Sequence, residues 1–408
     1  MQILFNLAFN SLLSRKATVF LTIVSLSLSI ILFLSIDTLR LGAKKSFFGN
    51  VKSGDLILGS RSGEIQLLLY SLFQIGSPTN NISWESYKEI SKKPEIDWIV
   101  PISLGDSHKQ FRVMGTTVDY FNKFSFRRNK KIKFKSGTYF QNTFDVVIGS
   151  DVSKILNYKL EDSIVISHGI ASQSLHDEFP FKVKGILKKT GTSLDRLVLV
   201  SLEALEVIHK DWKSGSKISS NINKQILAPN EITAAIIKLK SPIKIFKLQR
   251  EINNYEIEPL QAIIPGIVLT KLWQIVSITE NIMLSISTMV IVTSIIGMIA
   301  ILYSSLNGRR REMALLRIVG ASPNSIFSLM MIESLIISLS SILIALFVTQ
   351  FLSLIFFPLL DSQYGIFLEH TFLTTRDLYF LTLVLLSSLI VSIFPSIQAF
   401  KKSINYGV

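Results

Sequence analysis

Four long apolar stretches constrain this chain more than any other feature. Three of them contain no charged residue, and the fourth contains one, Glu333. A helix needs about 20 consecutive apolar residues to cross the hydrocarbon core of a bilayer, and a core helix of a soluble protein is rarely uncharged for so long. The stretches therefore predict transmembrane helices at residues 17–36, 282–306, 326–357 and 378–397.

The first stretch has a cleavable signal peptide as its alternative, because Arg15 and Lys16 precede it. Its uncharged run is longer than the roughly 7–15 residues of a signal-peptide core. It also follows a 16-residue leader rather than a short basic region. We therefore expect a membrane anchor that is retained.

The basic residues beside these stretches set the orientation. Segments 1–16, 307–325 and 398–408 carry net charges of +2, +3 and +2, whereas segment 358–377 carries −2. By the positive-inside rule the three basic segments, and with them both termini, lie in the cytoplasm. Residues 37–281 and 358–377 then lie on the outer side of the membrane.

Residues 37–281 are numerous enough to form a domain with its own core. Alternating runs predict strands at 55–58, 111–114, 145–148, 163–166, 181–187 and 197–200. Apolar periodicity predicts helices at 65–73, 84–91, 202–209 and 243–253. The expected fold class is an α-helical integral membrane protein with four transmembrane helices and a large α+β extracytoplasmic domain between helices 1 and 2. Residues 274–281 are expected to form a helical stalk into the second span, with an ordinary loop as the alternative.

The chain carries a net charge of +14 and contains no cysteine. Thiol catalysis and cysteine-ligated zinc are thereby excluded. The sequence has no GxxxxGK[ST], HExxH or GxSxG motif, so we expect no enzyme activity and no cofactor in this chain. His168 and His176 are the one local histidine pair; they are weak candidates for a metal site, and the default is that they are ordinary loop residues.

Residues 121–135 alternate phenylalanine with lysine and arginine, and the outer segment 37–281 carries +10 in total. In a soluble protein this pattern would favour nucleic-acid binding. Outside a membrane it indicates a solvated hairpin, or a surface that faces anionic lipid or an acidic partner. We expect no nucleic acid among the partners.

Two polar features lie within the spans. Glu333 is an intramembrane carboxylate, which by default is a functional hypothesis. A proton relay needs ionisable partners, and the other spans have none, so a structural hydrogen bond near the cytoplasmic interface is favoured. Small residues spaced four apart permit close helix approach; they are Ser25/Ser29, Ser334/Ser338 and Ser388/Ser392.

The cytoplasmic segment between the second and third spans reads RRREMALLRIVGAS over residues 309–322. Met313, Leu316 and Gly320 fall on one helical face, and Gly320 is suited to end a helix. Ser322 or Asn324 is suited to begin the next one. The segment is predicted to be a short amphipathic helix at the membrane surface, with a basic topogenic loop as the alternative.

This segment closely resembles the RRREIALLRALGAS-like signature of the FtsX-like permease domain. That domain occurs in the group of ABC-transporter membrane subunits that includes MacB, LolC/LolE and FtsX. The order of one anchor, a large outer domain and three further spans agrees, and Glu333 matches an acidic residue that the family often carries early in its third span. Residues 185–196, GILKKTGTSLDR, resemble an outer-domain pattern of MacB-like permeases, with Ser193-Leu194 where that branch tends to have Pro-Val.

The resemblance implies a permease subunit of an ABC transporter of mechanotransmission type in the bacterial inner membrane, with its outer domain in the periplasm. It implies a separate cytoplasmic ATPase that binds ATP and magnesium, and a second permease copy or a paralogue. A peptide, lipid or lipoprotein is the implied cargo, and membrane lipids and a periplasmic protein are further possible partners. The alternatives are a signalling complex that controls a periplasmic partner such as a cell-wall hydrolase, and a metal-handling system.

The resemblance also assigns roles to the cytoplasmic segment. Residues 308–322 become the coupling helix that docks on the ATPase, and its charged residues orient it: Arg309, Arg310, Arg311, Glu312 and Arg317. Its apolar residues enter the ATPase groove: Met313, Leu315 and Leu316. Gly320 ends the helix.

Overall fold

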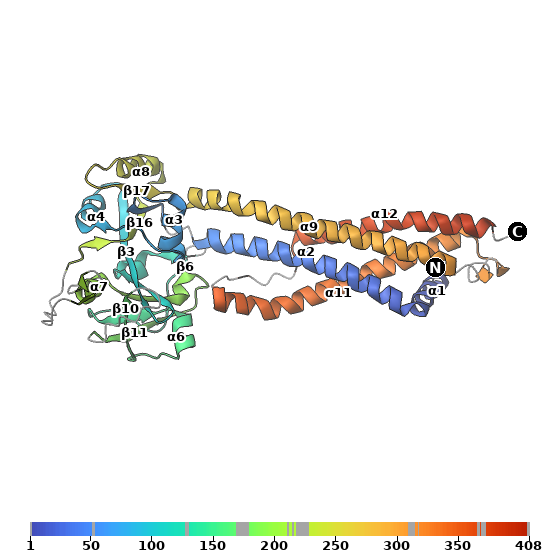
Figure 1. Cartoon of the computed structure of the whole chain (residues 1–408), viewed down its shortest axis with the longest axis horizontal. Helices are drawn as coiled ribbons and strands as arrows, with labels where there is room; N and C mark the ends of the chain where they lie inside the picture. Colours follow the sequence, from blue (N-terminus) through green and yellow to red (C-terminus); the bar gives the residue numbers. More distant parts are fainter. Residues whose placement is uncertain are drawn as a thin grey trace. The chain divides into compact units, whose positions relative to one another are not determined.

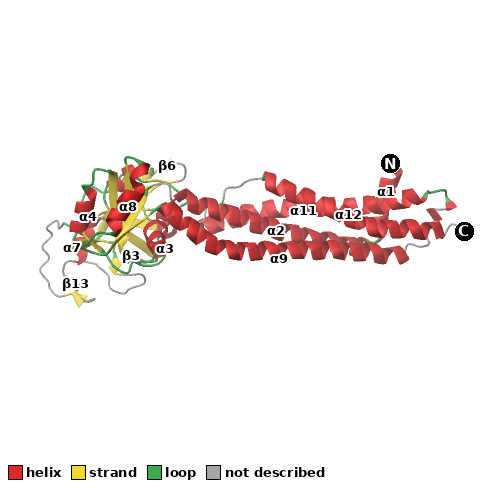
Figure 2. Ribbon diagram, turned by 90° about the horizontal axis from the view of Figure 1, so that it is seen from above, coloured by secondary structure: helices red, strands yellow, loops and turns green. Residues whose placement is uncertain are grey.

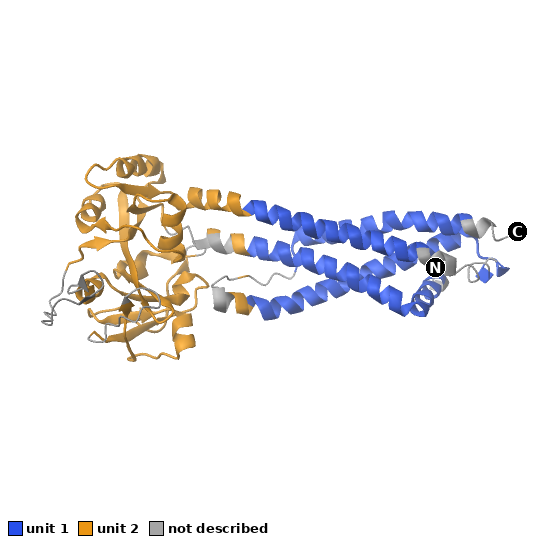
Figure 3. Cartoon of the chain, viewed as in Figure 1, with its two compact units in different colours: residues 1–42, 277–357, 369–408 blue, residues 43–276, 358–368 orange. Residues whose placement is uncertain are grey.

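The computed structural model divides the chain into two compact units, shown in Figure 3. The first unit comprises residues 1–42, 277–357 and 369–408, and the second comprises 43–276 and 358–368. The structure describes residues 2–50, 54–126, 130–168, 179–209, 212–213, 216–217, 228–308, 315–316, 318–364, 368 and 373–405.

The first unit is built from long helices that lie side by side (Figures 1 and 2). Its helices are α1 (Gln2–Ser14), α2 (Lys16–Asn50), α9 (Pro265–Gly308), α11 (Pro323–Tyr364) and α12 (Thr375–Asn405). Among the described residues, α2, α9, α11 and α12 are long and apolar enough to cross a membrane. They contain the four predicted spans and confirm the expected number.

Two of these helices extend beyond the predicted spans. The last residues of α2, 43–50, and the first residues of α9, 265–276, belong to the second unit. Helix α9 begins at Pro265, where proline is favoured because its missing N–H is not needed in the first turn. Residues 274–281 therefore lie inside a helix, as predicted, rather than in a loop.

Serine side chains bring the helices of the first unit together. Ser29 of α2 hydrogen-bonds Ser294 of α9 at 2.6 Å, and Ser338 of α11 hydrogen-bonds Ser388 of α12 at 2.7 Å. Small hydroxyl residues allow close helix approach where no hydrophobic effect drives association. Large apolar side chains such as Met289 point outward and are exposed, as expected for faces that meet lipid.

The second unit is organised around one large mixed sheet. In the described part of the chain this sheet has eleven strands, with the main path β17-β1-β16-β3-β4-β12-β8-β11-β7. The pairs β12–β4 and β11–β8 are parallel, and the other pairs are antiparallel. The strands are β1 (Leu56–Ser60), β3 (Ile96–His108), β4 (Phe111–Thr116), β7 (Phe134–Gly137), β8 (Asp145–Ile148), β9 (Ser163–Ile164), β10 (Ser167–His168), β11 (Phe181–Leu187), β12 (Leu197–Ser201), β16 (Ala234–Leu239) and β17 (Leu260–Ile263).

Short elements complete this unit. Three two-stranded pairs are formed by β2 (Ile82–Ser83) with β15 (Glu231–Ile232), β5 (Ser125–Phe126) with β6 (Lys130–Lys131), and β13 (Trp212–Lys213) with β14 (Ser216–Lys217). The helical elements are α3 (Glu64–Leu68), η2 (Leu69–Phe73), α4 (Trp84–Ser91), α5 (Asp119–Lys123), α6 (Ser150–Leu156), η3 (Ser193–Arg196), α7 (Leu202–His209), η4 (Pro242–Lys244) and α8 (Ile245–Asn253).

Both faces of the sheet are buried. In β1, Ile57 packs into one apolar cluster, whereas Leu56 and Leu58 pack into another. The first cluster also takes Phe48 from the end of α2 and Leu272 from the start of α9. A strand covered on both faces reads as a continuous apolar run. The second unit thus has the α+β architecture that the sequence predicts.

In the basic stretch 121–135, three phenylalanine side chains are buried and the described basic side chains are exposed. Its phenylalanines at 121, 124 and 126 are buried in the first cluster. Its described lysines are all exposed: Lys123, Lys130, Lys131, Lys133 and Lys135. Residues 127–129 lie outside the described residues. The alternation therefore corresponds to an apolar anchor with a solvated basic face.

The loop of the GILKKTGTSLDR segment is organised by Asp195, which is 1% exposed. Its carboxylate accepts hydrogen bonds from the backbone N–H groups of Thr190 and Gly191 and from the Thr190 hydroxyl. Gly191 has φ +66°, a left-handed conformation that glycine adopts without strain. Burial raises the pKa of the Asp195 carboxyl. This motif is therefore a structural turn.

Replacing Asp195 with alanine is expected to destabilise the second unit by about 3 kcal/mol, because buried N–H groups then lack acceptors. Thermal unfolding of the full-length protein, followed by circular dichroism, measures the loss. The control is Glu161→Ala, which removes an exposed partner of Lys184 and should change little. Equal melting curves for the two variants would contradict the assignment.

Candidate functional site

The segment between α9 and α11 presents an apolar face. Leu315 is 61% exposed, Ile318 80% and Val319 86%. Residues spaced three and four apart share one face of a helical turn. The segment lies between the membrane spans, since the second candidate span ends at Tyr303 and the third begins at Pro323. Exposed apolar residues grouped in this way indicate a contact surface for another protein or for the membrane. We call Leu315, Ile318 and Val319 the docking face.

The sequence identified only part of this face. Leu315 was predicted as a docking residue, but Leu316 is only half-exposed, and Ile318 and Val319 were missed. Their spacing from Leu315 was the signal that would have found them. The remaining predicted coupling residues, Arg309, Arg310, Arg311, Glu312, Met313 and Arg317, lie outside the described residues.

Backbone caps fix the turn that follows the docking face. Gly320 has φ +98°, and the N–H of Ala321 donates to the carbonyl of Leu316 at 2.9 Å, as in a glycine-terminated helix end. Ser322 then caps α11, because its hydroxyl accepts the N–H of Ser325 at 3.2 Å while Pro323 occupies the first helical position. The predicted cap at Gly320 and the helix start at Ser322 are confirmed.

The helices on either side of this turn are packed together. One buried apolar cluster joins α1, α9, α11 and α12. Its buried members are Leu12, Met298, Leu302, Ile326, Met330, Ile337 and Ala399. The helices that lead into and out of the turn are therefore packed against each other and against α1 and α12.

Glu333 lies near this end of the bundle and is fully buried. Its carboxylate accepts a hydrogen bond from the Ser11 hydroxyl at 2.7 Å and pairs with the guanidinium of Arg15 at 3.1 Å. Ser11 is on α1, and Arg15 lies at the junction of α1 and α2. These contacts agree with the structural interpretation of Glu333, and Arg15 is a partner that the sequence did not reveal.

The histidines of the second unit do not assemble a metal site among the described residues. His168 ends β10, and His176 lies outside the described part of the chain. His108 is buried, with Nδ1 2.6 Å from the Val165 carbonyl and Nε2 3.0 Å from the Tyr158 hydroxyl. Burial lowers the pKa of His108. Its contacts are those of a structural histidine.

A helical membrane unit whose first and second spans are separated by an α+β domain defines an integral membrane protein with an extracytoplasmic domain. Two family models match this chain: the MacB-like periplasmic core domain over residues 19–255 and the FtsX-like permease C-terminal domain over residues 284–404. The chain belongs to the FtsX/MacB-like family of ABC-transporter permeases. Members of this family are generally non-catalytic membrane subunits that work with a cytoplasmic ABC ATPase.

Two solved structures are similar to part of the chain. The periplasmic region of MacB from Actinobacillus actinomycetemcomitans is 11% identical, with 55% of this chain and 97% of that chain covered and a TM-score of 0.35. The extracellular domain of the noncanonic ABC-type transporter YknZ from Gram-positive bacteria is 13% identical, with 51% and 98% covered and a TM-score of 0.32. No curated protein sequence matches the chain.

Proposed function

We propose that this permease subunit works by mechanotransmission. A partner ATPase that binds ATP and magnesium displaces the coupling helix, residues 308–322, and α9 carries that displacement to the outer domain. The observation that supports this most directly is the continuity of α9 from Pro265 to Gly308. Its first residues belong to the second unit, and its last residue adjoins the coupling helix. A rigid element of this kind conveys movement between distant sites.

The exposure of the docking face supports its assignment as the site of contact with the ATPase. Leu315, Ile318 and Val319 are exposed apolar side chains that a groove on another protein would cover. The arginines of the coupling helix keep it at the cytoplasmic surface, so that both termini are cytoplasmic and the second unit is outside the inner membrane. A second permease copy or a paralogue completes the complex. The cargo that the family resemblance supports is a peptide, lipid or lipoprotein, extracted or exported.

Cysteine cross-linking tests the docking face directly, because the native chain contains no cysteine. Leu315→Cys, labelled with a maleimide that carries a photoreactive group, is expected to cross-link to the ABC ATPase in the assembled complex on illumination, and the yield should change when ATP is added. Ile243→Cys is the matched control, since Ile243 is 90% exposed on the second unit. Equal yields at the two positions would contradict the proposal.

A further inference from the structure

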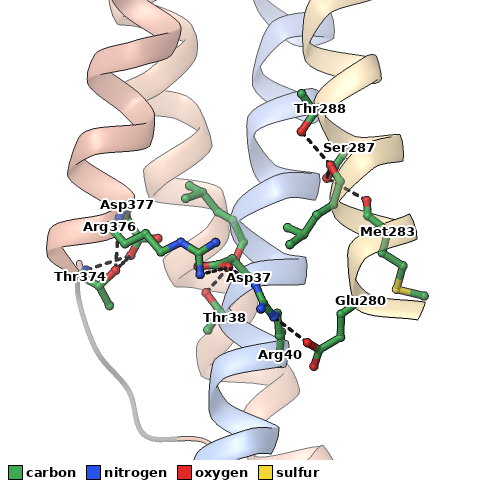
Figure 4. A network of polar contacts seen from close by, with 12 residues as sticks. Asp37, Thr38, Arg40, Glu280, Met283, Ser287, Thr288, Thr374, Arg376 and Asp377 are labelled. Atoms are coloured by element: carbon green, nitrogen blue, oxygen red, sulfur yellow. Dashed lines mark hydrogen bonds and ion pairs between the residues drawn. The ribbon is translucent and has the colours of Figure 1, made fainter. Parts of the chain in front are cut away.

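Four charged side chains form a linear network at the outer end of the bundle (Figure 4). Arg376 of α12 lies with Nη1 3.0 Å from Oδ1 of Asp37 on α2. Arg40, one turn further along α2, donates from Nε to Glu280 of α9 at 2.7 Å. The same Arg40 has Nη1 3.9 Å from Asp37. The network therefore joins three helices, with α2 in the middle.

Burial differs sharply along this network. Asp37 is 1% exposed, whereas the side chain of Arg376 is 50% exposed. A buried carboxylate needs a nearby cation, because an uncompensated charge is strongly destabilising. Asp37 Oδ1 accepts no hydrogen bond from a described residue, so it is held by the charges of Arg376 at 3.0 Å and, more distantly, Arg40 at 3.9 Å. Arg40, by contrast, makes a hydrogen bond to Glu280.

Deeper contacts hold the three helices together independently of the charges. Phe33 of α2 stacks on Phe380 of α12 with ring centroids 3.7 Å apart. Ser29 and Ser294 join α2 to α9. The first turn of α12 is fixed by its own cap, in which Thr374 and Asp377 exchange hydrogen bonds. Arg376 lies in the first turn of α12, whereas α2 and α9 continue past the network. The charged residues thus act on the start of α12, which can move away from α2 while the deeper contacts remain.

We infer that Arg40 is a switch residue that transfers between Glu280 and Asp37 and so couples movement of α9 to release of α12. When Glu280 moves away with α9, Arg40 stays on α2, three residues from Asp37, and replaces Arg376 as its cation. Arg376 is already half-exposed and returns to water. Arg40 lies 2.7 Å from Glu280 and 3.9 Å from Asp37 in the same structure, so a shift toward Asp37 needs only a small side-chain movement. A side chain that can favour either carboxylate is the two-state element that coupling requires. The role in transport rests on the mechanotransmission function proposed above.

Spin labels on the full-length chain in nanodiscs test the switch. Leu39→Cys on α2 and Thr375→Cys at the start of α12 place labels at exposed positions, beyond the Phe33–Phe380 stack. Arg376→Gln removes the cation of α12 and is expected to add a population at longer distance to the α2–α12 distance distribution. Glu280→Gln, a change on α9, is expected to add the same population. Glu64→Gln, in an exposed pair with Lys271, is the control and should leave the distribution unchanged.

A static network predicts a different result. If Glu280→Gln leaves the α2–α12 distances unchanged while Arg376→Gln lengthens them, the switch is refuted. If neither variant changes the distances, the charged network does not hold α12 against α2, and the switch is refuted as well. In the complex with its ATPase, Glu280→Gln should lower coupled turnover about fivefold or more, at the lower end of typical coupling energies. The distance measurement needs no ATPase, so failure of the switch and failure of mechanotransmission are distinguished.

Discussion

Replacing Ile318 with aspartate is expected to uncouple the partner ATPase from this permease. Ile318 is 80% exposed at the centre of the docking face, between Leu315 and Val319. Covering such a side chain stabilises a contact by about 2 kcal/mol, which is roughly thirtyfold in a binding equilibrium. An aspartate there adds the cost of burying a carboxylate without a partner. ATP hydrolysis stimulated by the permease in the reconstituted complex should fall by at least this factor.

The matched control for this change is Ile243→Asp, on the second unit. Ile243 is 90% exposed, so both variants add one acidic residue at an exposed isoleucine. Expression, membrane insertion and the basal activity of the isolated ATPase should be the same for both. Stimulated hydrolysis that is equally high in the two complexes would show that the docking face does not contact the ATPase.

The membrane part of the fold could be predicted from sequence because its signal is strong and local. A long run of uncharged apolar residues identifies a transmembrane span, and the basic residues beside it indicate its orientation. Strands and helices of the outer domain were also predicted where their patterns were regular. The predicted strand at 181–187 coincides with β11, and the predicted helices at 84–91 and 202–209 coincide with α4 and α7.

Central strands of the sheet were missed for a physical reason. Strand β3 contains Pro101, which usually argues against a central strand, and its pairing with β4 is irregular between Leu104 and Ser107. Strand β16 is AAIIKL and packs on both faces, so it has no alternation to detect. Such strands are specified by their neighbours in the sheet, which are distant in sequence.

The candidate site shows the same division between local and distant signals. The turn at Gly320 and Ser322 could be predicted, because helix caps depend on a few adjacent residues. The pairing of Arg15 with Glu333 spans 318 positions, and Arg15 lies just before the first span rather than inside one. A search for partners within the spans alone could not find it.

Replacing Arg15 with methionine is expected to destabilise the bundle severely. Methionine keeps much of the apolar stem of arginine but removes the cation that lies 3.1 Å from the fully buried Glu333 carboxylate. Removing one member of a buried pair costs about 3–5 kcal/mol. The fraction of full-length protein that remains folded and monodisperse after heating in detergent measures this loss.

Two comparisons separate the buried pair from the general effect of losing a basic residue. Lys16→Met removes the adjacent, exposed cation and alters the positive-inside signal equally, yet it should remain close to the native stability. The double change Arg15→Met with Glu333→Leu removes both charges, and it should recover most of the stability, because replacing a whole buried pair by apolar residues is often neutral or stabilising. If Arg15→Met is as stable as Lys16→Met, or if the double variant is no better than Arg15→Met alone, then the ion pair does not hold α1 to α11.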